Sequence, residues 1–226
     1  ADDLKTMAKC MIKLIKKNGT VIIEVQYLLN TLKDVTFDNI YHEHYNYWSL
    51  TSLVTFFKRM NATIYKAEKI DTHGGSLRVY VKKKLKTKVD KCVKLILENE
   101  EKFGVKKYQT YEDFAKKVYK IRDNVRKNIL KLKKNKTKII GYGSPAKATT
   151  ALNFFGISDE IECIVEDNKL KHGKFVPGMK IPITSKANIK KKPDYALVLA
   201  WNFIDEIKRK NSDLAHKFIS IKDLEN

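Results

Sequence analysis

The second part of the chain alternates short apolar runs with helix-like segments, and this alternation restricts the possible folds more than any other feature. The apolar runs are KIIGYG from Lys138, IECIVED from Ile161, YALVLAW over 195–201 and FISI over 218–221. The first of them leads into SPAKATTALNFFGI, a helical pattern in which Pro145 suits the first turn. Strands that alternate with helices form parallel sheets, so residues 136–226 are predicted to be a Rossmann-like domain.

Residues 1–83 predict a second, smaller α/β region. Its predicted elements are, in order, a helix over 2–18, a strand over 20–25, a helix capped by Ser49, and strands over 62–70 and 76–83. The strand TVIIEV is mostly apolar, which is typical of strands buried in a parallel sheet. The last two strands are joined by a short glycine turn and are predicted to be antiparallel neighbours.

Residues 84–135 predict a helical hairpin between these two regions. A first helix over 87–103 and a longer one with a 3–4 apolar rhythm meet around Gly104. Thr110 and Asp113 have the spacing of a capping box at the start of the longer helix. Two uses are open, a coiled coil between two copies of the chain or an intramolecular brace, and we favour the brace.

Composition excludes several classes of protein. The net charge is +20, but only five of the 46 basic residues are arginine, and the lysines are spread along the chain. Nucleic-acid binders concentrate arginine and aromatic residues on one surface, so we predict no specific nucleic-acid partner and attribute the charge to a lysine-biased genome. No apolar run approaches the roughly 20 residues of a membrane span. Three isolated cysteines predict a cytoplasmic protein without a zinc site.

The stretch IYHEHYNY, from Ile40, contains two histidines, a glutamate and three tyrosines. Such a cluster can transfer protons, bind a metal, or fill a polar corner of the fold. His42 and His44 are two residues apart, whereas the zinc ligands of an HExxH motif are four apart, so we predict no metal. The cluster follows a predicted strand, at the position where α/β folds place their sites. Proton transfer and a structural corner both remain open.

Two glycine motifs are candidate binding sites. GYGSPAKA over 141–148 is a turn that opens a helix, where backbone N–H groups attract anions. Ala146 replaces the third glycine of GxGxxG, so nucleotide contact and an ordinary tight turn are about equally supported. DTHGGSLRVY places His73 and Arg78 beside two glycines, a pattern that taken alone favours a hairpin turn with a surface arginine.

Four blocks together resemble one family in the same order along the chain. They are FDNIYHEHYNYWSLTSL, HGGSLRVYV, GYGSPAKATTALNFFGI and IVEDNKLKHGKFVPGMKIPI. The family is that of the S-adenosylmethionine-dependent sugar C-methyltransferases, which act on nucleotide-linked keto-sugars in deoxysugar biosynthesis. The resemblance covers essentially the whole chain.

The resemblance implies an α/β fold in three parts. Residues 1–83 would be the second half of a class I methyltransferase domain, 84–135 a hairpin connector, and 136–226 a Rossmann-like C-terminal domain. The family's zinc domain and the glycine loop that holds S-adenosylmethionine have no counterpart here. We therefore expect a truncated form with most of the cofactor site absent, no zinc, and a monomeric or weakly dimeric state.

The resemblance also implies roles for individual residues. His44 is the expected base that removes the proton next to the ketone, and Tyr41, His42 and Glu43 would orient the sugar or stabilise the enolate, which then takes the methyl group. The resemblance places His73 and Arg78 near the substrate. The helix N-terminus predicts diphosphate or nucleotide contacts for Gly141, Tyr142, Gly143, Ser144 and Lys147.

Two other functions remain open. The chain could be a non-catalytic module that binds a nucleotide sugar, or a dinucleotide binder that uses Gly141, Gly143 and Asp167.

Overall fold

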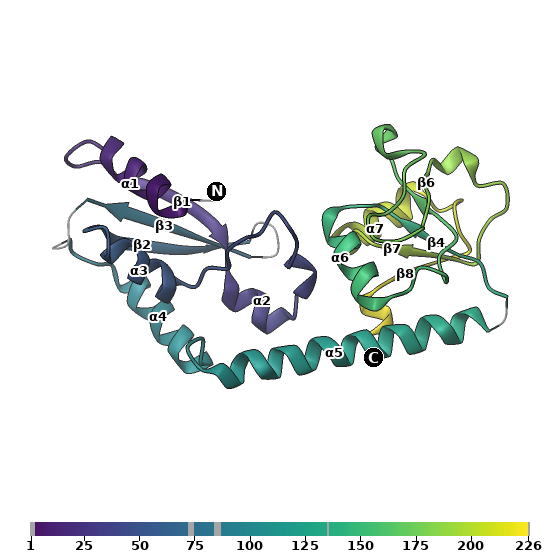
Figure 1. Cartoon of the computed structure of the whole chain (residues 1–226), viewed down its shortest axis with the longest axis horizontal. Coiled ribbons are helices and arrows are strands. Elements are labelled where there is room, and N and C mark those ends of the chain that lie inside the picture. Colours follow the sequence, from purple (N-terminus) through teal and green to yellow (C-terminus); the bar gives the residue numbers. More distant parts are fainter. Residues whose placement is uncertain (1–2, 72–74, 84–86, 135, 226) are drawn as a thin grey trace. The chain divides into compact units, whose positions relative to one another are not determined.

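The computed structural model describes residues 3–71, 75–83, 87–134 and 136–225 (Figure 1). They form two compact units. The first unit contains the residues up to Thr36 together with Tyr45–Phe114, and the second unit contains Phe37–His44 together with the residues from Ala115 onward. The histidine-containing segment 37–44 therefore groups with the C-terminal part of the chain and not with the residues that flank it in sequence.

The first unit is built on a three-stranded sheet with the order β1-β3-β2. The strands are β1 (Val21–Gln26), β2 (Thr63–Ile70) and β3 (Ser76–Lys82). The predicted antiparallel pairing of β2 with β3 is confirmed. The prediction that β1 is buried in a parallel sheet is wrong for the described residues. It pairs antiparallel with β3, and its side chains alternate in exposure, which leaves Ile22 59% exposed.

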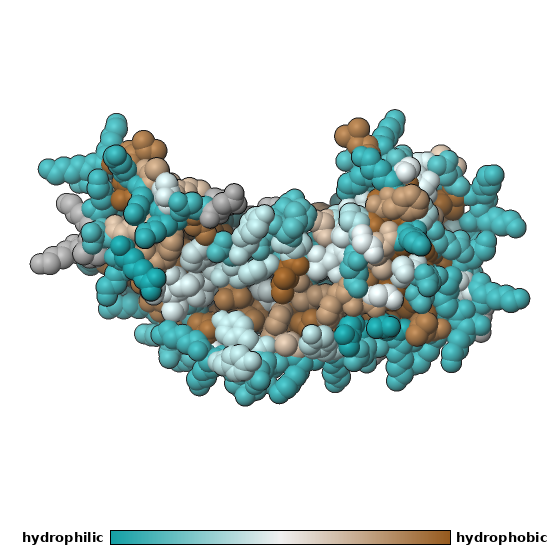
Figure 2. All heavy atoms as spheres, viewed as in Figure 1, coloured by the Kyte–Doolittle hydropathy of each residue, from teal (hydrophilic) through white to brown (hydrophobic). Residues whose placement is uncertain are grey.

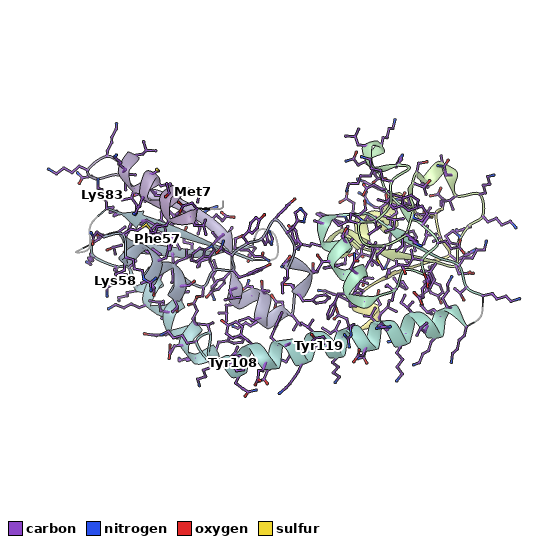
Figure 3. The ribbon with its side chains drawn as sticks, viewed as in Figure 1. Met7, Phe57, Lys58, Lys83, Tyr108 and Tyr119 are labelled. Carbon is purple, nitrogen blue, oxygen red and sulfur yellow. The ribbon has the colours of Figure 1, made fainter. Side chains whose placement is uncertain are left out.

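Four helices pack in this unit. They are α1 (Leu4–Leu14), α2 (Leu28–Asp34), α3 (Leu50–Lys58) and α4 (Lys91–Phe103). The predicted cap of α3 is confirmed, because the Ser49 side chain accepts from the N–H of Ser52, and the Ser52 hydroxyl in turn accepts from the N–H of Ser49. Phe57 of α3 is buried in the core while the next residue, Lys58, is exposed (Figure 3).

A buried carboxylate ties α4 to the start of α3. Glu100 is fully buried, and its oxygens accept from the N–H groups of Leu50 at 2.6 Å and Thr51 at 2.8 Å. The hydroxyl of Thr51 donates to the same carboxylate at 2.6 Å. The first N–H groups of a helix lack partners within the helix and carry partial positive charge. Glu100 therefore satisfies the N-terminus of α3 with a negative charge from another element.

The two helices predicted over 84–135 are present as α4 and α5 (Tyr108–Lys133). Gly104 ends α4 in the left-handed conformation, with φ +88°. The predicted capping box is wrong, because α5 already begins at Tyr108, and the hydroxyl of Thr110 donates to the carbonyl of Gly104 at 2.8 Å. The role of the two helices as a brace stays a prediction.

The second unit contains the predicted parallel sheet. Its strands are β4 (Ile139–Tyr142), β5 (Ile164–Val165), β6 (Ile183–Thr184), β7 (Tyr195–Val198) and β8 (Lys217–Ser220). All neighbours pair in parallel, in the order β6-β5-β4-β7-β8. The chain thus runs outward from β4 to β6 and then returns to the other side of β4. The strand order reverses between β4 and β7, which is where folds of this type bind ligands.

Besides the part of α5 from Ala115 onward, the second unit contains further helices and several 3-10 turns. They are α6 (Ala146–Phe155), α7 (Ile204–Lys210) and the 3-10 turns η1 (Phe37–Asn39), η2 (Lys169–Lys171), η3 (Lys186–Asn188), η4 (Trp201–Phe203) and η5 (Lys222–Leu224). Helix α7 ends at Lys210, and the residues after it enter the core, where Leu214 and Ala215 pack with Ile140 and Ala196.

The distribution of hydrophilic side chains on the surface is consistent with the spread of the lysines along the whole sequence. Figure 2 shows hydrophilic side chains over much of the visible face of each unit. Among the helices in the described ranges, none is both long and apolar enough to cross a membrane.

Replacing Glu100 by alanine is expected to lower the free energy of unfolding by about 3 kcal/mol, because it leaves buried N–H groups at the start of α3 without an acceptor. Denaturant unfolding followed by circular dichroism measures the change. The matched control is Glu101→Ala, since Glu101 is exposed and its carboxylate pairs with exposed Lys106. That control should change stability by less than about 0.5 kcal/mol. Equal effects of the two variants would contradict the role of Glu100.

Candidate functional site

Residues 41–44 form a tight turn, closed by the N–H of His44, which donates to the carbonyl of Tyr41 at 2.9 Å. In a turn of four residues the first and last come close together, while the two central residues point outward. His42 and Glu43 are the central residues, and their side chains are 81% and 66% exposed. Tyr41 and His44 are the end residues, and their rings lie with centroids 4.4 Å apart. The turn therefore separates the four residues into an exposed pair and a contacting pair.

The hydrogen bonds of His44 define its tautomer. Its Nδ1 lies 2.9 Å from the carbonyl oxygen of Asn39, which can only accept, so Nδ1 carries the hydrogen. Nε2 then holds the lone pair, and the hydroxyl of Tyr41 donates to it at 3.3 Å. Burial, together with the nearby carboxylates of Glu43 and Asp38, raises the pKa of Tyr41 and keeps it a donor. In the neutral imidazole Nε2 is therefore the accepting atom.

The turn is anchored to α6 through the residues that precede it. The ring of Phe37 packs against Phe154 and Phe155, with centroids 5.1 and 5.6 Å away. The buried carboxylate of Asp38 lies 3.7 Å from the ammonium of Lys147. Burial raises the pKa of Asp38, and Lys147 opposes this shift. Lys147, predicted to contact substrate phosphate, is instead placed beside an internal carboxylate.

A pocket of about 460 Å³ opens beside the turn, within the second unit. Its size lies in the usual range for small-molecule sites. Tyr41 and His42 line it together with Ser144, Ala146, Thr149, Thr150, Asn153, Lys171, Lys174, Phe175, Val176, Pro177 and Ile183. Lys171 and Lys174 are binding candidates that the sequence analysis missed. They lie in the long irregular segment after β5, where only their charge and the flanking glycines could have singled them out.

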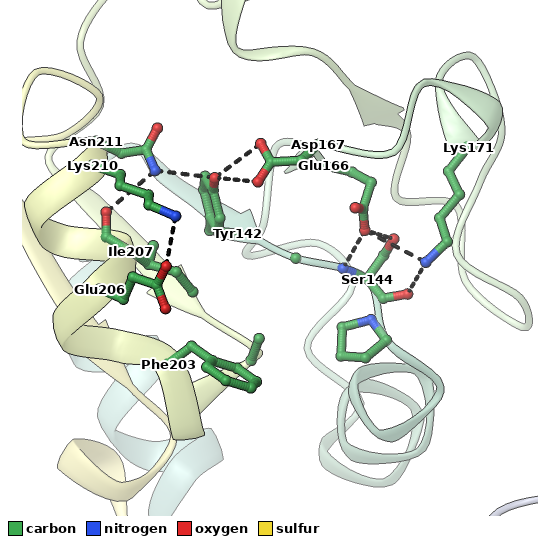
Figure 4. Close-up of a pocket in the computed structure, with 13 residues that line it drawn as sticks. Tyr142, Ser144, Glu166, Asp167, Lys171, Phe203, Glu206, Ile207, Lys210 and Asn211 are labelled. Carbon is green, nitrogen blue, oxygen red and sulfur yellow. Dashed lines mark hydrogen bonds and ion pairs between the residues drawn. The ribbon is translucent and has the colours of Figure 1, made fainter.

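The glycine turn after β4 leads into a helix as predicted. The backbone N–H of Ser144 in this turn, where an anion was expected to bind, already donates to a side chain of the protein. Gly143 adopts φ +83°, and the chain then enters α6. The carboxylate of Glu166 accepts from the N–H of Ser144 at 2.8 Å and from its hydroxyl at 2.5 Å (Figure 4). It also accepts from the N–H of Asn168 at 3.0 Å. Lys171 lies 3.5 Å from the same carboxylate. An internal side chain therefore takes the position that the sequence predicted for a phosphate.

Glu166 is charged because of these contacts. Burial favours the neutral form, but the hydrogen bonds from Ser144 and Asn168 and the charge of Lys171 outweigh it and lower the pKa of Glu166 to about 2. Gly141 has a packing role, because a Cβ there would lie 3.0 Å from the side chain of Ile164.

Tyr142 links three elements of the second unit. Its hydroxyl donates to the carboxylate of Asp167 after β5, 3.0 Å from each oxygen, and accepts from the amide of Asn211 at the end of α7 at 3.0 Å (Figure 4). Burial and the hydrogen bond to Asp167 raise the pKa of Tyr142 to about 12. The hydroxyl therefore stays protonated and connects β4, β5 and α7.

Of the remaining predicted residues, Arg78 lies on β3 of the first unit. The guanidinium of Arg78 donates to Glu24, its cross-strand partner on β1, at 2.8 and 3.1 Å. This is the contact of an ordinary sheet-surface arginine, and its predicted role toward substrate stays a prediction. His73 lies outside the described residues. Within the described ranges, no group of three or more potential metal ligands comes together.

Comparisons with known proteins give two findings. A family model described as "C-methyltransferase C-terminal domain" matches residues 71–220. The chain is also 33% identical over 197 residues to the C-methyltransferase NovU of Streptomyces niveus. That match covers 86% of this chain and 47% of NovU, so the chain spans about half the length of this relative.

The hydrogen bonds of Glu166 predict how the stability of the second unit depends on pH. The pKa of this carboxyl is about 2 in the folded chain and 4.5 ordinarily, so its stabilising effect is complete above about pH 4.5 and is lost as the pH falls toward 2. The Tm of the wild type should therefore fall more steeply between pH 5 and pH 3 than that of Glu166→Gln. Exposed Glu162 provides the control, since Glu162→Gln should keep the wild-type slope. Parallel curves for all three proteins would refute the assignment.

Proposed function

The chain belongs to the C-methyltransferase family, and on that premise we propose that it acts in the S-adenosylmethionine-dependent C-methylation of a nucleotide-linked keto-sugar. The observation that carries the proposal is the contact between Tyr41 and His44 beside the pocket of about 460 Å³. It joins an imidazole nitrogen able to accept a proton to a hydroxyl able to donate one.

In the proposed reaction His44 removes the proton from the carbon next to the ketone. Nε2 takes the proton, and the electron pair of the C–H bond moves into the ketone to give an enolate. The hydroxyl of Tyr41, which contacts Nε2 in the described structure, donates to the enolate oxygen once the sugar is bound. The carbonyl of Asn39 stabilises the imidazolium through Nδ1–H.

The pocket lining supports a sugar attached to a diphosphate. His42 lines the pocket and is placed to orient the sugar, whereas the predicted role of Glu43 is carried by the resemblance alone. Lys174 supplies positive charge for the diphosphate, whereas Lys171 is paired with Glu166. We place the diphosphate against Lys174 and not against the N–H of Ser144, since Glu166 already accepts from that group.

We assign no described residue to S-adenosylmethionine. A pocket beside α1 is lined by Lys9, Lys13 and Arg59, whose charges would repel a sulfonium cation. We therefore derive no step in which the methyl group moves, and the proposed mechanism is confined to proton abstraction.

Exchange of the sugar's α-hydrogen with solvent tests the base without any methyl donor. A nucleotide-linked keto-sugar incubated with the chain in D₂O should take up deuterium, and His44→Ala should slow the uptake by at least about a hundredfold. Mass spectrometry of the recovered sugar nucleotide gives the rate. His216→Ala is the matched control and should keep the wild-type rate, because that imidazole is exposed and does not line the pocket. If His44→Ala exchanged the α-hydrogen at the wild-type rate, the assignment of His44 as the base would be wrong.

Binding of the same sugar nucleotide tests the diphosphate position. Lys174→Ala should weaken binding about fivefold at low salt, and the difference should shrink as salt is raised. Isothermal titration calorimetry at two salt concentrations measures it. Lys180→Ala removes an exposed lysine that is not part of the pocket lining and should leave the Kd unchanged. Equal losses for the two variants would mean that the lysines act only through overall charge.

A further inference from the structure

A second pocket of the second unit, of about 530 Å³, lies where the strand order reverses. Residues that follow β4, β5 and β7 line it, among them Gly143, Asp167 and Ala200, with α7 on one side (Figure 4). The crevice beyond the carboxyl ends of the strands at such a reversal is the general ligand position of doubly wound sheets. The proposed reaction does not use this pocket.

The pocket is unsuited to phosphate. A dinucleotide would place its pyrophosphate on the N–H groups at the start of α6, but Glu166 accepts from Ser144 there. A phosphate at this position would meet a carboxylate that the same contacts keep charged. The two lysines of the lining are already engaged, since Lys171 contacts Glu166 and Lys210 contacts Glu206.

The pocket is suited to hydroxyl groups. Asp167 is exposed and accepts from the hydroxyl of Tyr142, which fixes the carboxylate and leaves it capacity for further donors. An acidic residue after the second strand of such a sheet is the group that binds the hydroxyls of a ribose. Asp167 follows β5, the second strand of this sheet in chain order.

An exposed aromatic ring completes the wall. Phe203 is 61% exposed although it is one of the largest apolar side chains of the unit, and it lines the pocket together with Ala200 and Ile207. Figure 4 shows its ring on the α7 side, across from Ser144. A flat apolar surface beside hydroxyl acceptors suits a ring joined to a sugar, because bases stack on aromatic side chains.

We propose that this pocket binds a nucleoside that carries no 5′-phosphate. The ribose hydroxyls donate to Asp167, the base stacks on Phe203, and Glu166 excludes the phosphorylated forms. The site adjoins the pocket beside Tyr41 and His44, with which it shares Ser144 and Lys171, and it adds a second ligand to the one on which the proposed reaction acts.

Titration calorimetry of the full chain with adenosine, uridine and their 5′-monophosphates tests this site. At least one nucleoside should bind, and its monophosphate should bind at least about tenfold more weakly because it meets Glu166. Phe203→Ala should weaken nucleoside binding about tenfold. Phe175→Ala is the matched control, since Phe175 is 60% exposed but belongs to the other pocket, and it should leave the Kd unchanged.

Glu166→Gln should reduce the difference in binding affinity between the nucleoside and its monophosphate. If circular dichroism shows that this variant is unfolded, the difference in affinity between nucleoside and monophosphate for the wild-type chain still tests the site. No binding of either nucleoside, equal or tighter binding of the monophosphates, or an unchanged Kd for Phe203→Ala would each overturn the site. Deuterium exchange at the keto-sugar is a separate measurement, so failure of the nucleoside site leaves the proposed reaction untouched, and the reverse also holds.

Discussion

The placement of functional groups in this molecule depends on internal glutamates that neutralise helix N-termini. Glu100 accepts from the first N–H groups of α3, and Glu166 accepts from Ser144 at the entry to α6. A helix N-terminus attracts any nearby anion, and here the chain itself supplies one. Fixing α6 matters most for the site, because α6 presents Lys147 and the phenylalanines that hold the segment of η1.

The histidine-containing turn follows from that anchoring. Phe37 and Asp38 attach the start of the segment to α6 by ring packing and an ion pair, and the chain then reverses over 41–44. The reversal brings Tyr41 and His44 into contact and turns His42 and Glu43 outward. The two histidines of this stretch thus acquire different surroundings, since the imidazole of His44 contacts the backbone carbonyl of Asn39 and that of His42 is exposed.

The local sequence pattern predicted most helices and strands, but it did not predict how all the strands pair with one another. The parallel strands of the second unit, the antiparallel pair of β2 and β3 and the cap at Ser49 were all predicted, because period and cap chemistry are properties of neighbouring residues. The pairing of β1 was predicted wrongly, since an apolar strand of six residues carries no information about the direction of its neighbour. The start of α5 was also missed, because Thr110 uses its hydroxyl on Gly104 and not as a cap.

The sequence alone determined the order of strands and helices, the family, and the presence of a proton-capable cluster after a strand. Tertiary structure alone decided which side chains meet: Glu166 with Ser144, Lys147 with Asp38, and Arg78 with Glu24. The physical reason is that hydrophobic periodicity acts between near neighbours, whereas charge pairing depends on distances between residues far apart in the chain. The site therefore differs most from the sequence prediction where an anion was expected and the protein had placed its own.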